Sequence, residues 1–275
     1  MAGKQVTELP KIQNSKLTDL LMVHDGYGLK SISVEDFNSG VSDNAGAHNS
    51  IFRGKYLGER VTDEQYSSIA DGSFKNLFIG DYWTIGGVNY RIAGFDYYYR
   101  CGDVDFTKHH VVLVPDTHLY THNMNDTDTT EGGYVGSKMY KEGLEQAKKT
   151  IKEAFFGHVA THRNCFTNAV LNGRPSFGAW FDSEVALMNE NMLYGGRQFS
   201  PMNDGTNIPY NYTVERGQLP LFHLAPNFIH ANRDKWYWLR DVVSANYFAR
   251  VDDFGIPYYG GANDVGGVRP AFCIS

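Results

Sequence analysis

The sequence has few cysteines and no long hydrophobic run. Cys101, Cys165 and Cys273 lie far apart and are odd in number, so we expect neither a disulfide framework nor a CxxC zinc site. The first residues lack the apolar core of a secretory signal, and no stretch approaches the roughly 20 apolar residues that cross a bilayer. We therefore expect a protein made in a reducing cytosol, without signal-peptide export or membrane insertion.

Basic clusters and catalytic motifs are also missing. The net charge is −6 and the lysines and arginines are scattered, so we expect no nucleic-acid partner, because phosphate contacts need clustered Lys and Arg. There is no GxSxG elbow, no P-loop and no GxGxxG that opens a helix. No carboxylate pair stands out for glycoside hydrolysis. The sequence thus predicts a protein that is not an enzyme and needs no cofactor.

The residues that are present favour a globular α+β protein. Hydrophobic residues make up 42% of the chain and aromatic residues 14%, and 29 glycines outnumber 9 prolines, which favours many strands and tight turns. A capping box at Thr62 and Gln65 starts a predicted helix that ends near Gly72. The clearest helical periodicity covers Ser137 to Phe156, and Gly157 stops or kinks it.

Strands are predicted between these helices. Tyr82–Ile85 and Val88–Ala93 flank Gly86-Gly87 as a hairpin, and His110–Val114 is a buried strand. Thr121–Gly133 is predicted to be a polar loop. Two stretches stay open: 158–170 continues the helix or forms a strand, and 183–193 forms a short helix or two strand pieces. Leu219–Leu224 is expected to be a buried strand or loop.

The first 50 residues form a predicted separate module. Leu17–Val23 and Leu29–Ser33 alternate as a hairpin, and a helical turn capped by Ser33 follows at Val34–Phe37. Because so small a hairpin is not stable alone, we expect it to pack on copies of itself or on a partner. The segment Asn38–Ser50 is predicted to be a flexible tether to a second domain, residues 51–275.

Two groups of side chains have weak metal-ligand spacing. His158, His162 and Cys165 would share one face of a helix and could hold zinc, although no acidic residue stands between the two histidines. Asp126, Asp128 and Glu131 alternate in a turn-rich segment but lack the ligand order of an EF-hand. Surface or core polar roles explain both groups as well, and we predict no metal site.

The last forty residues, 236–275, have apolar ends and a middle of a different character. The middle carries tyrosines, asparagines and charges with no helical stripe, between core-like valines and turn-forming glycines. Tyrosine and asparagine on glycine-rich loops are typical of adaptable binding surfaces. An ordinary β-meander at the end of a domain is the alternative.

Six segments together resemble a known family. They read GDYWTIGG, HHVVLVPDT, GGYVGS, MNE, WYWLRD and GVRPAF, and they lie at 80–87, 109–117, 132–137, 188–190, 236–241 and 267–272. They resemble phage and prophage tail proteins whose C-terminal half is a C-type-lectin-like domain, relatives of the variable proteins that retroelements diversify. The N-terminal segment LTDLLMVHDGYGLKSISVEDF separately resembles attachment modules of tail fibre and baseplate proteins.

This resemblance implies a fold and a role. The fold would be a C-type-lectin-like domain with short twisted antiparallel strands and two helices, preceded by a small β-hairpin attachment module. The protein would be a homotrimeric receptor-binding protein at the phage tail tip, in the virion. It would bind a protein or glycan receptor on a bacterial surface, and other tail or baseplate proteins through its N-terminus. The implied ligand-binding residues are Asn246, Tyr247, Arg250, Asp252, Asp253, Phe254, Ile256, Tyr258, Tyr259, Asn263 and Asp264.

The sequence also departs from relatives of that fold. Sugar-binding C-type lectins use Glu-Pro-Asn or Gln-Pro-Asp with Trp-Asn-Asp, and none of these triplets occurs here, so calcium-dependent sugar binding is not implied. Two other functions remain open. One is a tail-associated hydrolase of cell wall or polysaccharide, and the other is a structural decoration protein of the virion.

Certain residues are predicted to hold the larger domain together. We expect Arg240 and Arg269, each inside an apolar stretch, to be buried and hydrogen-bonded to carboxylates or backbone carbonyls. The expected core residues are Trp83, Trp236, Trp238, Leu239, Val268 and Phe272.

Overall fold

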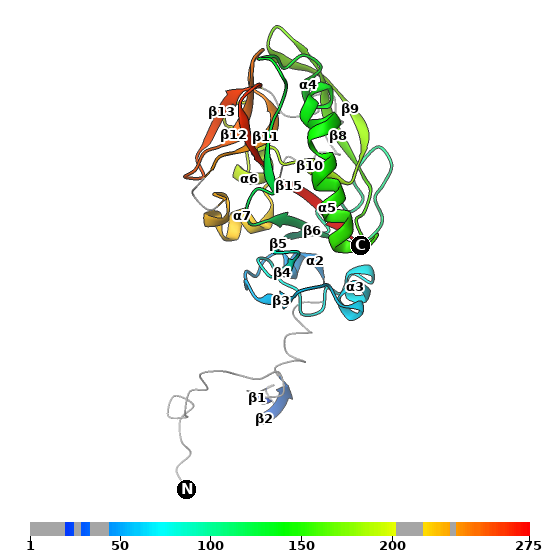
Figure 1. Ribbon diagram of the computed structural model, residues 1–275. Helices are drawn as coiled ribbons and strands as arrows, with labels where there is room; N and C mark the ends of the chain where they lie inside the picture. The colour runs from blue at the N-terminus through cyan, green and yellow to red at the C-terminus, as the bar shows by residue number, and fades with distance from the viewer. Residues whose placement is uncertain (1–19, 25–28, 34–43, 202–216, 232–234) are drawn as a thin grey trace. The chain divides into compact units, whose positions relative to one another are not determined.

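The computed structural model describes residues 20–24, 29–33, 44–201, 217–231 and 235–275. The chain divides into two compact units, 1–43 and 44–275 (Figure 1).

The smaller unit contains the predicted hairpin. Strands β1 (Leu20–His24) and β2 (Leu29–Ser33) pair antiparallel, with Leu20 opposite Ser33 and His24 opposite Leu29. The predicted hairpin is therefore confirmed. The helical turn expected at Val34–Phe37 lies outside the described residues.

The predicted tether is wrong in its second half. Residues 44–50 belong to the larger unit and include the short helix α2 (Ala45–His48), which Asn44 caps by accepting a hydrogen bond from the Ala47 amide. His48 is fully buried and its Nδ1 lies 2.5 Å from the Leu77 carbonyl oxygen. The small, polar residues of this segment predicted a linker. Instead, the buried His48 anchors the segment to the larger unit. Residues 38–43 lie outside the described part.

A six-stranded sheet forms one half of the larger unit. Its order is β10-β15-β6-β5-β4-β3, and the labels in Figure 1 descend through the molecule in that order. The hairpin of β4 and β5 is the predicted one, joined through Gly86-Gly87, both at positive φ. The strands are β3 (Tyr56–Gly58), β4 (Tyr82–Ile85), β5 (Val88–Phe95), β6 (Val111–Pro115), β10 (Val185–Leu187) and β15 (Pro270–Ile274).

A five-stranded sheet of order β13-β12-β11-β14-β7 forms the other half. The edge strand β7 lies mostly in a segment that was predicted to be loop; it pairs with β14 from Asn123 opposite Val265 to Tyr120 opposite Val268. The strands are β7 (Tyr120–Asn123), β11 (Tyr237–Val242), β12 (Tyr247–Val251), β13 (Pro257–Gly261) and β14 (Val265–Val268). A separate long hairpin consists of β8 (His162–Leu171) and β9 (Arg174–Ser183).

The helices are few and short. The capping box of α3 (Asp63–Ala70) is confirmed, since Thr62 and Gln65 each accept a backbone hydrogen bond from the other. The long helix predicted over 137–156 is instead a π-helical turn, η2 (Met139–Gly143), followed by α5 (Glu145–Phe155). A Cβ on Gly143 would lie 2.9 Å from the His122 ring, so that ring crowds the chain where the helix is irregular.

The other helices of the described residues include α4 (Gly133–Gly136), α6 (Glu190–Tyr194), α7 (Pro220–Leu224) and the 3-10 turn η5 (Pro226–Phe228). The strand or loop expected at Leu219–Leu224 is therefore wrong: Pro220 stands at the first turn, where a missing N–H costs nothing. The stretch 183–193 combines β10 and α6. None of the described helices is long and apolar enough to span a membrane.

The fold is thus mixed α+β, with strands predominating. Among the expected core residues, Trp83, Trp238, Leu239, Val268 and Phe272 are buried. Trp236, which directly precedes the central strand β11, is only half-buried.

The two arginines are buried and hydrogen-bonded, as predicted. Arg269 stands between β14 and β15, and its guanidinium donates to the carbonyl oxygens of Pro115, Phe228 and Ile229 at 2.8 to 3.0 Å, and to the Tyr237 hydroxyl. Arg240 donates to the Leu187 carbonyl oxygen at 2.7 Å. Backbone carbonyls therefore accept most of these hydrogen bonds.

Replacing Arg269 by alanine should lower the free energy of unfolding by about 3 kcal/mol or more, because buried carbonyls would lose their donors. Chemical denaturation measures this change. The matched control is Lys148→Ala, which removes a cation paired with Glu145 on the surface of α5 and should cost less than about 1 kcal/mol. Equal losses for the two variants would contradict a structural role for the buried guanidinium.

Candidate functional site

The predicted ligand-binding residues lie on the hairpin of β12 and β13 and in the turns at its two ends. β13 is the edge strand of the five-stranded sheet. Tyr247, Phe254, Ile256 and Tyr258 are exposed by 41%, 75%, 55% and 45%. Tyr259 is half-buried. The rings are thus accessible to a partner, as a binding role requires.

Four rings are in contact along this edge. Tyr258 and Tyr259 stack with an interplanar angle of 2° and centroids 5.0 Å apart, and Tyr247 lies 5.2 Å from Tyr259. Phe199, which the sequence analysis missed, packs edge-on against Tyr259 at 5.3 Å and against Tyr258 at 6.1 Å. We call Phe199, Tyr247, Tyr258 and Tyr259 the aromatic edge.

The strand register divides the aromatic edge between the two faces of the sheet. Tyr259 lies opposite Ala249, whereas Tyr258 lies opposite Arg250. Residues opposite each other in a pair of strands point to the same face, and neighbours along a strand point to opposite faces. The Cα–Cβ bonds of Tyr258 and Tyr259 are therefore expected to point to different faces of the sheet. Within the described residues β13 is at the edge of its sheet, and the rings of Tyr258 and Tyr259 nevertheless stack there.

Arg250 fixes the inner margin of this cluster. Its guanidinium carbon lies 4.4 Å from the centre of the Trp236 ring and 5.1 Å from that of Tyr258, and its Nε donates to the Tyr259 carbonyl oxygen at 3.1 Å. Trp236 is in turn pressed against Gly266, where a Cβ would come within 2.1 Å of the indole. The cation is therefore held between two rings and a carbonyl.

The turn from β12 to β13 is built around one carboxylate. Asp252 Oδ1 accepts hydrogen bonds from the backbone amides of Phe254 and Ile256 at 2.9 and 2.8 Å. The Tyr194 hydroxyl donates to the Gly255 carbonyl oxygen at 3.1 Å, and burial raises the pKa of Tyr194, so the donor stays protonated. Asp252 is thus a structural member of the predicted set, and it presents the exposed side chains of Phe254 and Ile256.

At the other end of the hairpin, polar residues meet the loop at 125–131. The Asn246 side-chain amide donates to the Asp128 carbonyl oxygen at 2.5 Å, and the Asn263 backbone amide donates to the Asp128 carboxylate at 3.3 Å. Asp264 accepts a hydrogen bond from the Gly261 amide at 2.9 Å. Asp128 therefore belongs to this surface, although it was considered only as a calcium ligand.

A buried carboxylate holds Phe199 in place. Glu190 is fully buried, and its two oxygens accept hydrogen bonds from the backbone amides of Gln198, Phe199 and Ser200 at 2.8 to 3.1 Å. The Glu190 backbone amide donates to Asp241 Oδ2 at 2.8 Å, which ties this anchor to β11. In the sequence, the glycines Gly195 and Gly196 before Phe199 were the only signal that this ring lies in an exposed turn. That Phe199 lies beside β13 is a consequence of the fold.

The predicted metal-ligand spacings do not become metal sites. His162 and Cys165 lie on strand β8, not on a helix, and His158 precedes it, stacked on Tyr66 at 3.5 Å. Asp126 pairs with Lys138 at 2.6 Å, which holds the pKa of that carboxyl below its usual range. No group of three or more His, Cys, Asp or Glu side chains within the described ranges is arranged to hold a metal ion.

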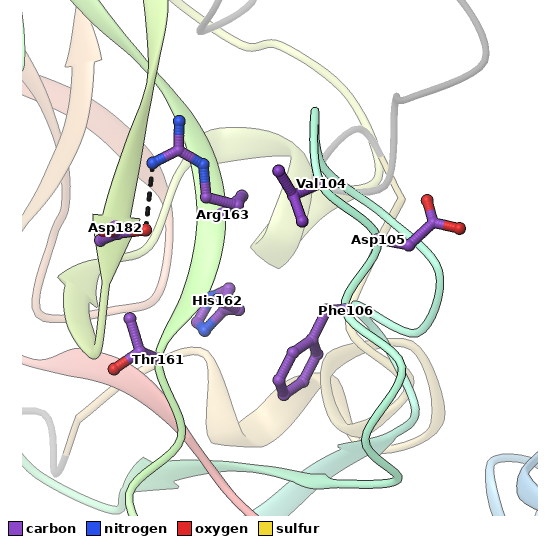
Figure 2. Close-up of a pocket in the computed structure, with 7 residues that line it drawn as sticks. All are labelled: Val104, Asp105, Phe106, Thr161, His162, Arg163 and Asp182. Atoms are coloured by element: carbon purple, nitrogen blue, oxygen red, sulfur yellow. Dashed lines mark hydrogen bonds and ion pairs between the residues drawn. The ribbon is translucent and has the colours of Figure 1, made fainter.

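A pocket of about 320 Å³ lies elsewhere, between residues 104–106 and the start of β8 (Figure 2). Figure 2 shows Arg163 directed toward Asp182, and the hydrogen bond between them is 3.0 Å long. The ring centroids of Phe106 and His162 lie 5.9 Å apart. Burial lowers the pKa of His162 to about 3, so its imidazole is neutral at physiological pH. The His162 ring packs against Tyr98, with the ring centroids 4.1 Å apart. An imidazole with so low a pKa is a poor general base near neutral pH.

Comparison of this chain with protein families, curated proteins and solved structures finds no match.

Replacing Glu190 by glutamine should release the loop that carries Phe199. The glutamine amide would face backbone donors, so the hydrogen bonds to residues 198–200 weaken and the free energy of unfolding falls by about 2 kcal/mol. Hydrogen–deuterium exchange should accelerate at residues 198–200 more than in the core strands. Glu153→Gln, on the exposed side of α5, is the matched control and should change neither quantity. Unchanged exchange at 198–200 would refute the anchoring role.

Proposed function

We propose that this protein is a receptor-binding protein of a phage tail, which attaches to a bacterial surface through the hairpin of β12 and β13. The observation that supports the proposal most is the aromatic edge. Contiguous exposed aromatic surface on a folded domain marks an interaction site more often than it serves stability.

The construction of the surface is consistent with that role. Tyrosine rings supply large contact area at low cost in conformational entropy, and here they sit on strands and anchored turns rather than on long loops. Asp252 and Glu190 fix the backbone from below through hydrogen bonds to amides. A bound receptor would therefore meet a surface that is already ordered, which reduces the entropy lost on binding.

The finer parts of the proposal come from the resemblance in sequence. They are a C-type-lectin-like fold for residues 51–275, a homotrimer, and attachment to other tail or baseplate proteins through the hairpin of β1 and β2. The mixed α+β architecture is compatible with the first of these, the fold, and does not bear on the other two. Several weak contacts made at once by a trimer would add through their effective concentration.

Alanine substitutions on the predicted surface test the proposal. We expect Tyr247→Ala, Phe254→Ala and Tyr259→Ala to weaken adsorption of the full-length protein to susceptible bacterial cells. One or two of these substitutions should weaken the free energy of binding by about 2 kcal/mol, which raises Kd about 30-fold, as truncation of an interface anchor residue does. The melting temperature should stay that of the parent protein, because these rings are exposed or half-buried.

The control is Phe156→Asn, which removes a ring that is 87% exposed at the C-terminal end of α5. Asparagine tolerates the left-handed backbone of that residue, where φ is 42°. Adsorption that survives all three alanine substitutions, or a strain panel on which the parent protein binds no cells, would refute the proposal.

A further inference from the structure

The charge distribution around the aromatic edge indicates what kind of partner it fits. Carboxylates lie at both ends of the hairpin: Asp253 in the turn after β12, Asp264 in the turn after β13, and Asp128 in the loop at 125–131 that contacts that second turn. None of the ion pairs recorded among the described residues involves these three side chains. A partner that approaches the edge therefore meets unneutralised negative charge on either side of the rings.

Two arginines close to the rings do not pair with these carboxylates. Arg250 is enclosed by the Trp236 and Tyr258 rings and bonded to a carbonyl, so it faces into the cluster. Arg197, beside Phe199, donates to the Pro201 carbonyl oxygen. Both are engaged with the protein's own backbone rather than with the carboxylates at the ends of the hairpin.

The rings of this edge already bind a guanidinium within the molecule. The faces of Tyr and Trp attract cations, by about 0.5–1 kcal/mol at exposed sites. Arg250 makes one such contact with Tyr258. The solvent-accessible parts of the Tyr247, Tyr259 and Phe199 rings remain available for cation–π contacts with a partner. Rings and carboxylates together therefore favour a positively charged group.

We infer that the aromatic edge, if it is the receptor-binding surface proposed above, recognises a lysine- and arginine-bearing loop of a bacterial surface protein. The side chains on the turn after β12 favour such a loop over an amino sugar. Phe254 and Ile256 are exposed apolar groups next to Asp253, and lysine and arginine carry an alkyl stem behind their charge. An amino sugar presents its ammonium among hydroxyl groups and offers no such stem.

The test uses a short peptide that alternates glycine and lysine, titrated into the full-length protein and followed by NMR of the tyrosine and phenylalanine rings. We expect the signals of Tyr247, Tyr258, Tyr259 and Phe199 to shift. Affinity should fall about tenfold when the lysines are acetylated, because the cation–π and carboxylate contacts are lost together. It should also fall as salt rises, since exposed charges are screened.

The double variant Asp253→Asn/Asp264→Asn should weaken peptide binding about fivefold. The control Glu142→Gln/Glu153→Gln, which also removes two negative charges but from η2 and α5, should not. A chain of net charge −6 attracts any cationic peptide weakly, so equal losses in the two double variants would overturn the inference. Equal binding of the acetylated peptide, or tighter binding of glucosamine than of the lysine peptide, would also overturn it.

This outcome is separable from the proposed function. If adsorption to cells depends on Tyr247 and Tyr259 but the lysine peptide is not preferred, the receptor role stands and the cationic epitope is wrong. If the peptide binds at the aromatic edge but the ring substitutions leave adsorption unchanged, the edge is a cation-binding surface and the receptor lies elsewhere.

Discussion

The buried guanidinium of Arg269 is the interaction on which the larger unit depends. It lies where the chain leaves β14 of the five-stranded sheet and enters β15 of the six-stranded sheet. Its hydrogen bonds reach the end of β6 at Pro115, the 3-10 turn at Phe228 and the start of β11 at Tyr237. One side chain thus satisfies carbonyls from segments that no strand pairing joins. The guanidinium thereby connects the two sheets, and these partners are needed because a buried charge without hydrogen bonds is costly.

The aromatic edge stands outside this network, and that separation matters for function. Its rings contact one another, Arg250 and solvent, whereas the strands beneath them are held by Phe248, Ala249 and Val251, all fully buried. Stability and recognition therefore rest largely on different side chains of β12, with Tyr247 exposed and Phe248, Ala249 and Val251 buried. A surface built in this way can change its outward residues at little cost to the fold, because a substitution there removes no core packing.

The sequence predicted the parts that local chemistry determines. The capping box at Thr62, the Gly86-Gly87 hairpin and the burial of Arg240 and Arg269 follow from short-range patterns, and all are present. Prediction failed where distant residues decide. Residues 44–50, predicted to be a tether, are held by the buried His48. Strand β7 depends on its pairing with the distant β14. The histidine and cysteine spacing that suggested zinc presumed a helix, whereas that segment is the strand β8. Phe199 could not be assigned to the site, because only Glu190 and the edge position of β13 bring it there.

The division of the rings between two sheet faces changes how the site must work. A flat face would contact a partner with every second residue of each strand, whereas an edge strand contributes neighbouring residues, so Tyr258 and Tyr259 act as one stacked unit. Substituting either one removes the stacking partner of the other, so their effects on binding should not be additive. Phe199 touches both tyrosines and is held by a carboxylate in the core, which couples the outermost part of the surface to α6. The buried Glu190 thus helps to position the ring of Phe199 against the two tyrosines, whereas the exposed side chains themselves can be substituted without loss of core packing.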